Sequence, residues 1–266
     1  MKTFKYWAKT EGVLLVEGVS TKAMFLGGSD SSEQDAKRNA VKKFEAVQRK
    51  INGAKQEFEE YEVEIKEEQI ERISDSMVIT RNRYGAHVLN VEDQMILDID
   101  QTPASFFDLF SRRTDDWKIN KLDKAVEKLN QKVDDGFLGF RLYKTCAGFR
   151  IIITGKPIHP KDKLAEQISR SLNVDPLYWQ LCKKQDCYRA RLTPKSYRIK
   201  YKPIKIKLPD SLERKEEINS WEIGYLKASK NYAVCKYIKT IGNHSTNQLV
   251  SVHDEYTQAT SDRKLA

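Results

Sequence analysis

The sequence predicts an α+β fold, in which a central and mostly antiparallel sheet is packed by helices and preceded by an N-terminal β-β-α unit. Short apolar runs typical of strands recur along the chain, and longer segments carry apolar residues at helical spacing. No apolar run approaches the ~18 residues that a membrane-spanning helix needs. The chain has 266 residues, of which 39% are hydrophobic and 32% charged. That length suffices for one large domain or two small ones.

Residues 1–75 are expected to form the N-terminal unit, and residues 76–266 the larger α+β part, unless both make one compact domain. Two strand-like runs, over 13–16 and 22–26, flank Glu17-Gly18-Val19-Ser20, which is typical of a hairpin turn. A helix should follow from about Ser32 to Ile51, because capping residues precede it and apolar residues recur at helical spacing. Acidic residues in its first turn, such as Glu33, would repel a phosphate backbone, so we interpret the unit as a scaffold with an acidic extension.

The same periodicities predict the remaining elements. Strands are expected over 77–80, 88–91, 137–144, 149–154 and 232–239, and helices over 104–110, 117–133, 161–172 and 212–227. One more helix should begin after Asp175, which is suited to cap it. Near the C-terminus, His253 and Asp254 could add an imidazole or a carboxylate to a site, and the final residues are expected to fray.

An apolar strand that ends in Asp98-Ile99-Asp100 carries the clearest chemical signal. Residues i and i+2 of a strand project to the same face, so the two carboxylates should lie side by side. Two like charges that close stay ionised most easily with a cation between them. Because oxygen ligands suit hard cations, the pattern predicts a Mg²⁺ or Mn²⁺ site. The alternative is a strand end at which both carboxylates reach water.

The charge of the chain favours an anionic partner, such as DNA or RNA. Its formal net charge is +9, and most of the excess lies between Lys183 and Lys207. Ten basic residues occur in that tract against one acidic residue, Asp186. The alternative is that the tract is an ordinary solvated surface.

Part of this tract is expected to be a strand over residues 187–195, with basic and apolar residues alternating as far as Tyr201. Paired arginines on one face of a strand suit phosphate oxygens, and interleaved tyrosines can stack on bases. The alternative is a basic edge strand that guards against aggregation. The residues predicted to contact nucleic acid here are Arg189, Arg191, Lys195 and Arg198.

A polar turn between two predicted strands offers a second group of contacts. Arg81, Asn82 and Tyr84 precede Gly85, which permits close approach of a backbone. Such a turn could hold a phosphate or a base. A purely structural turn is the alternative.

The cysteines and the N-terminus indicate a cytoplasmic protein with reduced thiols. The four cysteines form no CxxC pair, and the N-terminus lacks the apolar core of a signal peptide. Cys182 and Cys187 could form a zinc site with His159 or Cys235, although free cysteines are often simply buried.

Three motifs occur in an order that points to a known superfamily. They are an hhhDhD strand ending at Asp100, a Thr-x-x-Gly-x-basic strand reaching Arg150, and the pair Val174-Asp175 ahead of an Arg-x-Arg-Leu strand. Over about residues 90–200 this order resembles the archaeo-eukaryotic primase and primase-polymerase superfamily. The chain also resembles a set of bacterial proteins that share GGSD, RNxYGA, DID, TxAGxR and RARLTPK, a likeness that names no activity.

The resemblance to the primases implies a nucleotidyltransferase that uses a nucleoside triphosphate and Mg²⁺ or Mn²⁺. In that superfamily two carboxylates of the first motif and a later Asp hold the metals, so Asp98, Asp100 and Asp175 would be the metal ligands. A basic residue of the second motif binds the phosphates of the incoming nucleotide, which gives this role to Arg150. The superfamily has His at that position, but Arg can also bind a triphosphate.

Two further hypotheses remain open. The missing His favours a nucleic-acid-binding protein with a decayed site and no catalysis. The stretch 98–102 also fits the DxDxT motif of haloacid-dehalogenase-type phosphatases, in which Asp98 would be the nucleophile and Asp100 the acid/base. That fold usually opens with this strand, whereas here the N-terminal unit precedes it.

Overall fold

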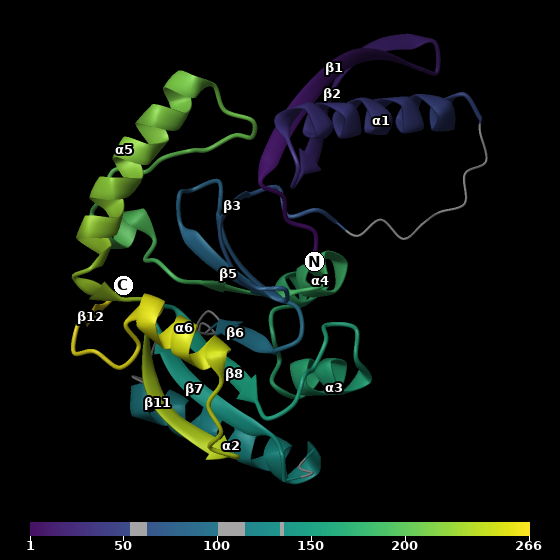
Figure 1. The fold of residues 1–266 in the computed structure, drawn as a ribbon. Coiled ribbons are helices and arrows are strands. Elements are labelled where there is room, and N and C mark those ends of the chain that lie inside the picture. Colours follow the sequence, from purple (N-terminus) through teal and green to yellow (C-terminus); the bar gives the residue numbers. More distant parts are fainter. Residues whose placement is uncertain (54–62, 101–114, 134–135) are drawn as a thin grey trace, which may run out of the picture.

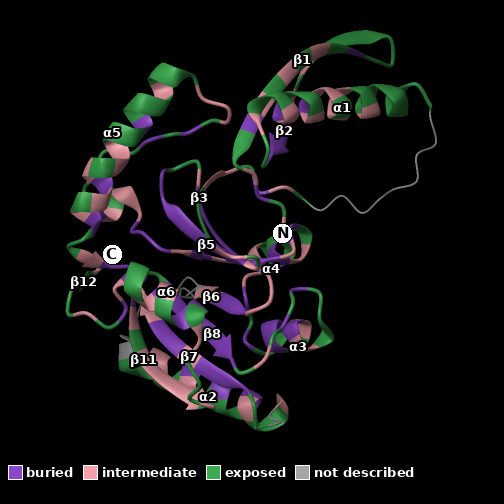
Figure 2. Ribbon diagram, in the orientation of Figure 1, coloured by how far each residue is buried: buried purple, intermediate pink, exposed green. Residues whose placement is uncertain are grey.

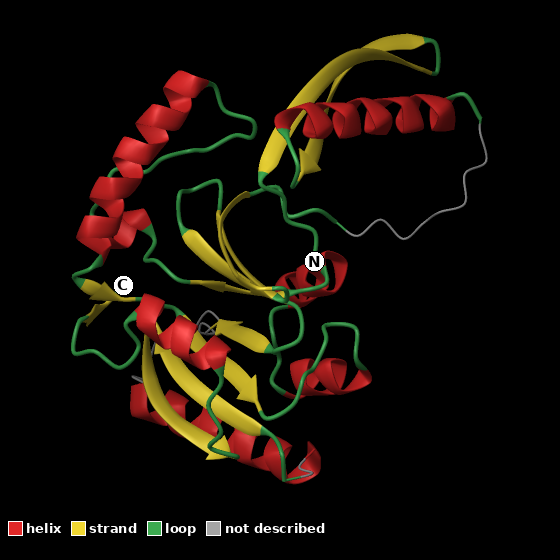
Figure 3. Ribbon diagram, viewed as in Figure 1, coloured by secondary structure: helices red, strands yellow, loops and turns green. Residues whose placement is uncertain are grey.

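The computed structural model of the chain describes residues 1–53, 63–100, 115–133 and 136–266, with the backbone alone at Asp100 and Asp115. Within these ranges the fold is α+β and begins with a β-β-α unit (Figure 1), which confirms the predicted class. Figure 3 shows the helices lying around two neighbouring groups of strands. The helix expected over 104–110 lies outside the described residues.

The N-terminal unit is a long hairpin covered by one helix. Strands β1 (Tyr6–Val16) and β2 (Val19–Ser29) pair along their whole length, and α1 (Glu33–Ile51) lies across one face. The turn residues Glu17 and Gly18 both have positive φ angles, as a two-residue hairpin turn of matching twist requires. The predicted hairpin and helix are therefore confirmed.

Small residues let this helix lie directly on the hairpin. A Cβ at Gly27 would come within 2.2 Å of the backbone oxygen of Ala36, and both Ala36 and Ala40 are fully buried. Ser32 caps the helix, since its hydroxyl accepts a hydrogen bond from the backbone N–H of Asp35. Towards the tip of the hairpin, by contrast, much of the surface is exposed (Figure 2).

The first four-stranded sheet has the order β3-β4-β5-β9, and all its pairs are antiparallel. Its strands are β3 (Glu68–Ser74), β4 (Met77–Arg81), β5 (His87–Val91) and β9 (Tyr188–Arg191). The predicted domain boundary at residue 75 falls between β3 and β4, which pair with each other. Strands from both sides of that boundary therefore share one sheet.

The second four-stranded sheet has the order β11-β7-β8-β6 and is also antiparallel. Its strands are β6 (Ile96–Asp100), β7 (Gly139–Thr145), β8 (Gly148–Thr154) and β11 (Cys235–Gly242). The DID strand is β6 and lies at an edge. The antiparallel sheet that we expected to carry this strand is confirmed, with a second sheet beside it.

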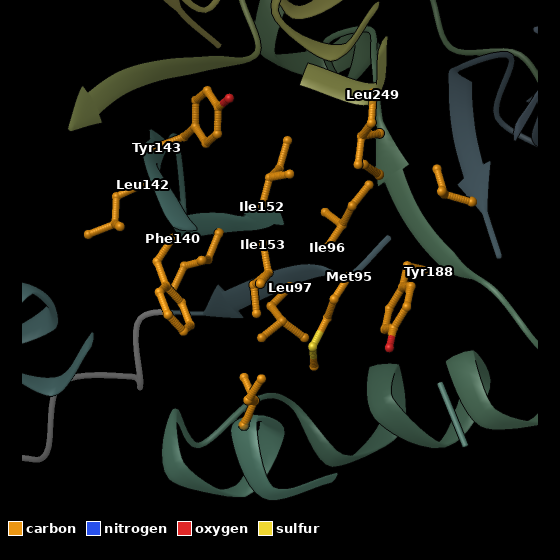
Figure 4. Close-up of a cluster of buried hydrophobic side chains, with 14 of the residues drawn as sticks. Met95, Ile96, Leu97, Phe140, Leu142, Tyr143, Ile152, Ile153, Tyr188 and Leu249 are labelled. Carbon is orange, nitrogen blue, oxygen red and sulfur yellow. The ribbon is translucent and has the colours of Figure 1, made fainter. Parts of the chain in front are cut away.

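Helices cover both faces of the second sheet (Figure 1). They are α2 (Asp115–Val133), α3 (Lys163–Ser171) and α6 (Gln248–Thr257). The apolar stripe predicted for α2 is buried in the main core, where Leu122, Val126 and Leu129 lie. Figure 4 shows Ile96 and Leu97 of β6 among buried side chains from the neighbouring strands.

Helix α4 (Pro176–Gln185) joins the two sheets where β6 and β9 approach each other without pairing. The hydroxyl of Tyr178 lies 2.7 Å from the backbone oxygen of Ile96 on β6 and 3.3 Å from that of Arg189 on β9. One half-buried hydroxyl thus lies within hydrogen-bond distance of backbone oxygens of both sheets at their junction.

The C-terminal part forms an outer layer beside the first sheet. Its elements are the 3₁₀ turn η1 (Ser196–Ile199), α5 (Leu212–Ser229), β10 (Tyr232–Ala233) and β12 (Lys264–Leu265). The expectation that the final residues fray was wrong: β12 pairs in parallel with β10, and Ala266 is buried beside Tyr225 of α5. Among the described residues no helix is long and apolar enough to cross a membrane.

Candidate functional site

A row of polar side chains crosses the second sheet from its edge inward. Asp98 on β6 lies opposite Arg150 on β8, and Arg150 lies opposite Tyr143 on β7. Cross-strand partners share one face of a sheet, and here it is the face that α6 covers. Two residues predicted to be catalytic, Asp98 and Arg150, are therefore direct neighbours.

Arg150 is the centre of this row, and its side chain is only 3% exposed. Its Nε and Nη2 donate hydrogen bonds of 2.7 and 3.1 Å to the two carboxylate oxygens of Asp98, and its Nη1 donates to the backbone oxygen of Arg191 at 3.0 Å. Burial alone would lower the pKa of Arg150, but the Asp98 carboxylate raises it above the usual value. The guanidinium therefore stays charged, and its two-point contact fixes the orientation of Asp98.

His253 extends the network into α6. Its ring is fully buried, with Nε2 lying 3.2 Å from Nη1 of Arg150 and Nδ1 lying 2.9 Å from Oδ1 of Asp254. Because an arginine can only donate, we assign Nε2 as an acceptor and the ring hydrogen to Nδ1. Burial lowers the pKa of His253 to about 4, against the opposing effect of Asp254 and with a further lowering by Arg150. The ring is therefore neutral at physiological pH.

Asp254 ends the chain of hydrogen bonds. It accepts one from the hydroxyl of Tyr143 and one from Nη2 of Arg141, each at 2.7 Å. Burial alone would raise the pKa of Asp254, but the hydrogen bonds from His253, Tyr143 and Arg141 lower it below the usual value. The network thus holds two carboxylates and two guanidinium groups, which balance in charge. The late imidazole and carboxylate noted in the sequence belong to this network.

Arg191 brings another guanidinium close to Arg150. It is half-buried, and its side chain forms no hydrogen bond or ion pair with the residues that the structure describes. Burial lowers its pKa, and the nearby charges of Arg150 and Arg198 lower it further. Three guanidinium groups therefore gather here, and among the residues that the structure describes only that of Arg150 forms an ion pair with a carboxylate.

The described residues fit the predicted Mg²⁺ or Mn²⁺ poorly. Both oxygens of Asp98 accept hydrogen bonds from Arg150, and the carboxylate of Asp175 caps α4 by accepting the Tyr178 N–H at 2.8 Å. No three potential ligands come together in the part of the chain that the structure describes. The side chain of Asp100 lies outside that part, so its role as a ligand stays a prediction.

The cysteines proposed for zinc are buried thiols. Burial raises the pKa of Cys182 and of Cys187 to about 12. Zinc binds the thiolate form, which such burial disfavours. Zinc binding also stays a prediction.

The basic tract divides into two parts with different environments. Arg189 is engaged inside the first sheet, where its Nη2 and Nε donate to Glu67 at 2.5 Å and to Asn90 at 2.8 Å. From residue 191 to residue 207, which we call the cationic segment, no basic side chain forms an ion pair with the residues described by the structure. Its basic residues are Arg191, Lys195, Arg198, Lys200, Lys202, Lys205 and Lys207.

The strand expected over 187–195 is shorter than predicted, because β9 ends at Arg191, and the residues that alternate as far as Tyr201 include the 3₁₀ turn η1. Beyond η1 the chain runs alongside α5. Ile204 and Ile206 are buried against α5, so the alternating residue Lys205 faces solvent. The alternation predicted as far as Tyr201 therefore reflects no strand pairing, and the extended segment that packs on α5 comes after it.

Tyr197 is the exposed aromatic residue of the cationic segment. Its side chain is 67% exposed, and the charged groups of Lys195 and Arg198 lie 6.0 and 5.8 Å from its ring centre. The other tyrosines expected to stack on bases are occupied elsewhere, since Tyr188 is fully buried and Tyr201 packs against Trp221.

Arg81, which was predicted to contact nucleic acid, is buried and paired with acidic residues of the protein itself. It is 4% exposed and forms ion pairs with Glu68 and with Glu222, the latter at 2.5 Å. Glu222 also accepts a hydrogen bond from His87, at 2.7 Å. These contacts tie the end of β4 to α5 and occupy both terminal nitrogens of Arg81, while its buried Nε has no hydrogen-bond partner among the described residues.

The rest of the polar turn has one rigid and one exposed part. The side-chain oxygen of Asn82 accepts the backbone N–H groups of Tyr84 and Ala86, which fixes the turn. Tyr84 itself is 49% exposed, with the guanidinium of Arg83 lying 4.6 Å from its ring centre. Tyr84 is therefore the predicted residue of this turn that is free to meet a ligand.

Comparisons of the chain with models of known protein families, with curated proteins and with solved structures gave no match. The function must therefore be argued from the site itself.

Lowering the pH should destabilise the protein through His253. Its pKa is about 4 in the folded state, against an ordinary value of 6.5. Between about pH 6.5 and pH 4 the unfolded chain binds more protons, so the free energy of unfolding falls as the pH falls, by roughly 3 kcal/mol. Urea unfolding across this range measures the effect.

Two variants isolate the contribution of this histidine. His253→Gln should lose this part of the pH dependence, because no imidazole remains to be protonated. His159→Gln, at an exposed histidine, should keep it. If the free energy of unfolding depends on pH equally steeply in the natural protein and in His253→Gln, the role given to His253 is contradicted.

Removing the carboxylate of Asp98 should destabilise the fold. Asp98→Asn leaves the buried guanidinium of Arg150 without its carboxylate, at a cost of about 3 kcal/mol. Asp98→Leu combined with Arg150→Met should cost less than the sum of the two single changes, because no unpaired charge stays buried. Chemical unfolding measures all of these, and strictly additive losses would show that the two residues are not energetically coupled.

Proposed function

We propose that the protein binds single-stranded nucleic acid through the cationic segment and does not require a metal ion for binding. The observation that carries this proposal is the run of seven basic side chains, from Arg191 to Lys207, without an acidic partner among the described residues. Unpaired cations on a surface bind a polyphosphate chain and release its counterions, which is favourable without any base contact. Cations that already had carboxylate partners would gain much less.

Exposed aromatic residues support a single-stranded ligand. Tyr197 lies between Lys195 and Arg198, and Tyr84 is covered on one side by Arg83. Unpaired bases stack on such rings while neighbouring cations bind the phosphates, which is how proteins bind single strands without reading sequence. The bases of a duplex are already stacked on each other and cannot use these rings.

Arg191 supports a phosphate contact at the inner end of the cationic segment. Its neighbours Arg150 and Arg198 are also cationic, and burial together with their charges already lowers its pKa. A phosphate beside Arg191 would stabilise its charged form, which burial disfavours, and could accept two hydrogen bonds from one guanidinium. This position lies next to Asp98, so the ligand would pass the DID strand.

Metal-dependent nucleotidyl transfer is the second candidate. Asp98 keeps 38% of its side chain exposed, close to cations that could hold a triphosphate. A metal at Asp98 would have to compete with Arg150 for the carboxylate. In a phosphatase mechanism Arg150 would likewise have to release Asp98 before that carboxylate could act as the nucleophile. Binding that needs Mn²⁺, or a rise in melting temperature with Mn²⁺ that is lost in Asp100→Asn, would favour this second candidate.

Charge reversal in the cationic segment should weaken binding. With Arg191→Glu and Arg198→Glu, we expect a fluorescein-labelled oligothymidine to bind at least ~10-fold more weakly in fluorescence anisotropy. The slope of log affinity against log salt should become shallower by roughly 1.5, since two phosphate contacts are lost. The control variant with Lys22→Glu and Lys42→Glu, at exposed lysines of the N-terminal unit, has the same net charge. Equal losses in both variants would contradict the proposal.

Removing the ring of Tyr197 should affect single strands selectively. Tyr197→Ala should weaken binding of the same oligonucleotide by roughly 5- to 100-fold, the range expected for one lost stacking contact. Tyr197→Phe keeps the ring and should bind normally. Duplex binding should hardly change in either variant. If duplex DNA binds more tightly than single strands and loses as much in Tyr197→Ala, the single-strand assignment is wrong.

A further inference from the structure

We propose that a cavity between the ends of α5 and α6 and the first sheet binds a small molecule with an apolar body and one carboxylate. The cavity has a volume of about 390 Å³, which lies within the range of ligand pockets in proteins. Its lining includes residues near the C-terminal ends of α5 and α6 and Arg263, which precedes β12. This proposal does not depend on the nucleic-acid-binding function.

The floor of the cavity is apolar and comes from four different elements. Ile70 and Ile79 lie on β3 and β4, Leu192 follows β9, and Leu226 lies on α5. Val234 closes it from the link between β10 and β11. Aliphatic walls of this kind favour a ligand with a hydrocarbon body, because its burial removes apolar area from water at about 25 cal/mol per Å².

The charged residues around the cavity favour a carboxylate head. Lys230 and Arg263 both line it and are exposed, and neither side chain forms an ion pair or hydrogen bond with the described residues. Glu255 is the only acidic residue in the lining. Two free cations against one acid give the mouth of the cavity a positive bias, and both cations have flexible side chains that can follow a bound carboxylate.

The helix ends near the cavity do not reverse this preference. α5 and α6 both end there, and the last carbonyl groups of a helix attract cations. These groups are already paired, however, since Asn231 donates its N–H to Ala228, Ala259 to Asp254, and Val234 to Thr257. A cationic ligand would therefore find few free acceptors, whereas a carboxylate finds two unpaired donors.

Three ten-carbon probes of equal length test the charge and shape of the ligand. Isothermal titration calorimetry with the full-length protein should give saturable binding of decanoate, with a Kd of roughly 10 µM to 1 mM. Decanol should bind at least ~5-fold more weakly, and decylamine more weakly still. The proposal is overturned if decanoate shows no saturable binding, or if decanol or decylamine binds as tightly.

Variants of residues that line the cavity test whether decanoate binds there. Lys230→Glu with Arg263→Glu should weaken decanoate binding by at least ~10-fold and improve decylamine binding. Lys227→Glu, at an exposed lysine of α5 that does not line the cavity, should leave both unchanged. Leu226→Trp should fill the cavity and abolish binding while the melting temperature stays within a few degrees. Unchanged decanoate binding in the double variant and in Leu226→Trp would mean that the probe binds elsewhere.

Discussion

The fold depends on compensating the positive charge of Arg150. A guanidinium cannot lose its proton in a protein, so a side chain that is 3% exposed must find partners within the structure. It finds the carboxylate of Asp98 on the edge strand β6, the backbone oxygen of Arg191 at the end of β9, and the ring of His253 on α6. Because these groups come from both sheets and a covering helix, one ion fixes how the layers meet. Tyr178 supports the same junction by bridging β6 and β9.

The same compensation decides which chemistry the site favours. A carboxylate that faces a guanidinium with both oxygens is oriented and neutralised, which suits it less to hold a metal or to act as a nucleophile. Arg150 also donates a hydrogen bond to the backbone oxygen of Arg191, which brings the start of the cationic segment close to it. The charge of Arg150 is already balanced by Asp98. The pair therefore fixes the backbone at the start of the cationic segment, next to the side chains to which we assign binding.

Sequence periodicity predicted the elements well because the signals that define them are local. The capping serine before α1, the apolar stripe of α2 and the hairpin of β7 and β8 each depend on residues close in the chain. The pairing of Asp98 with Arg150 could not be predicted this way, because it follows from the register of two strands with a helix between them in the sequence. For the same reason nothing in the turn indicated that Arg81 would be buried against Glu222 of α5. The alternation beyond Pro194 did not mark a strand, because residues 196–199 form the 3₁₀ turn η1, and a period read over so few residues does not distinguish a turn from a strand.

Folding concentrates the charge of the chain in a way that counting residues cannot reveal. The sequence shows a dense basic tract from Lys183 to Lys207, yet in the fold some of its basic residues form ion pairs and others do not. Arg189 is neutralised by Glu67, which lies far away in the sequence. Lys183 approaches Glu166 of α3, at 3.9 Å. Glu67 thus pairs with the part of the tract that lies in the sheet, while the basic side chains beyond β9 form no ion pair with the described residues. An anionic ligand gains most where folding has left cations unpaired, so the surface that we propose for nucleic acid begins at Arg191, beyond the basic residues that acidic residues pair with.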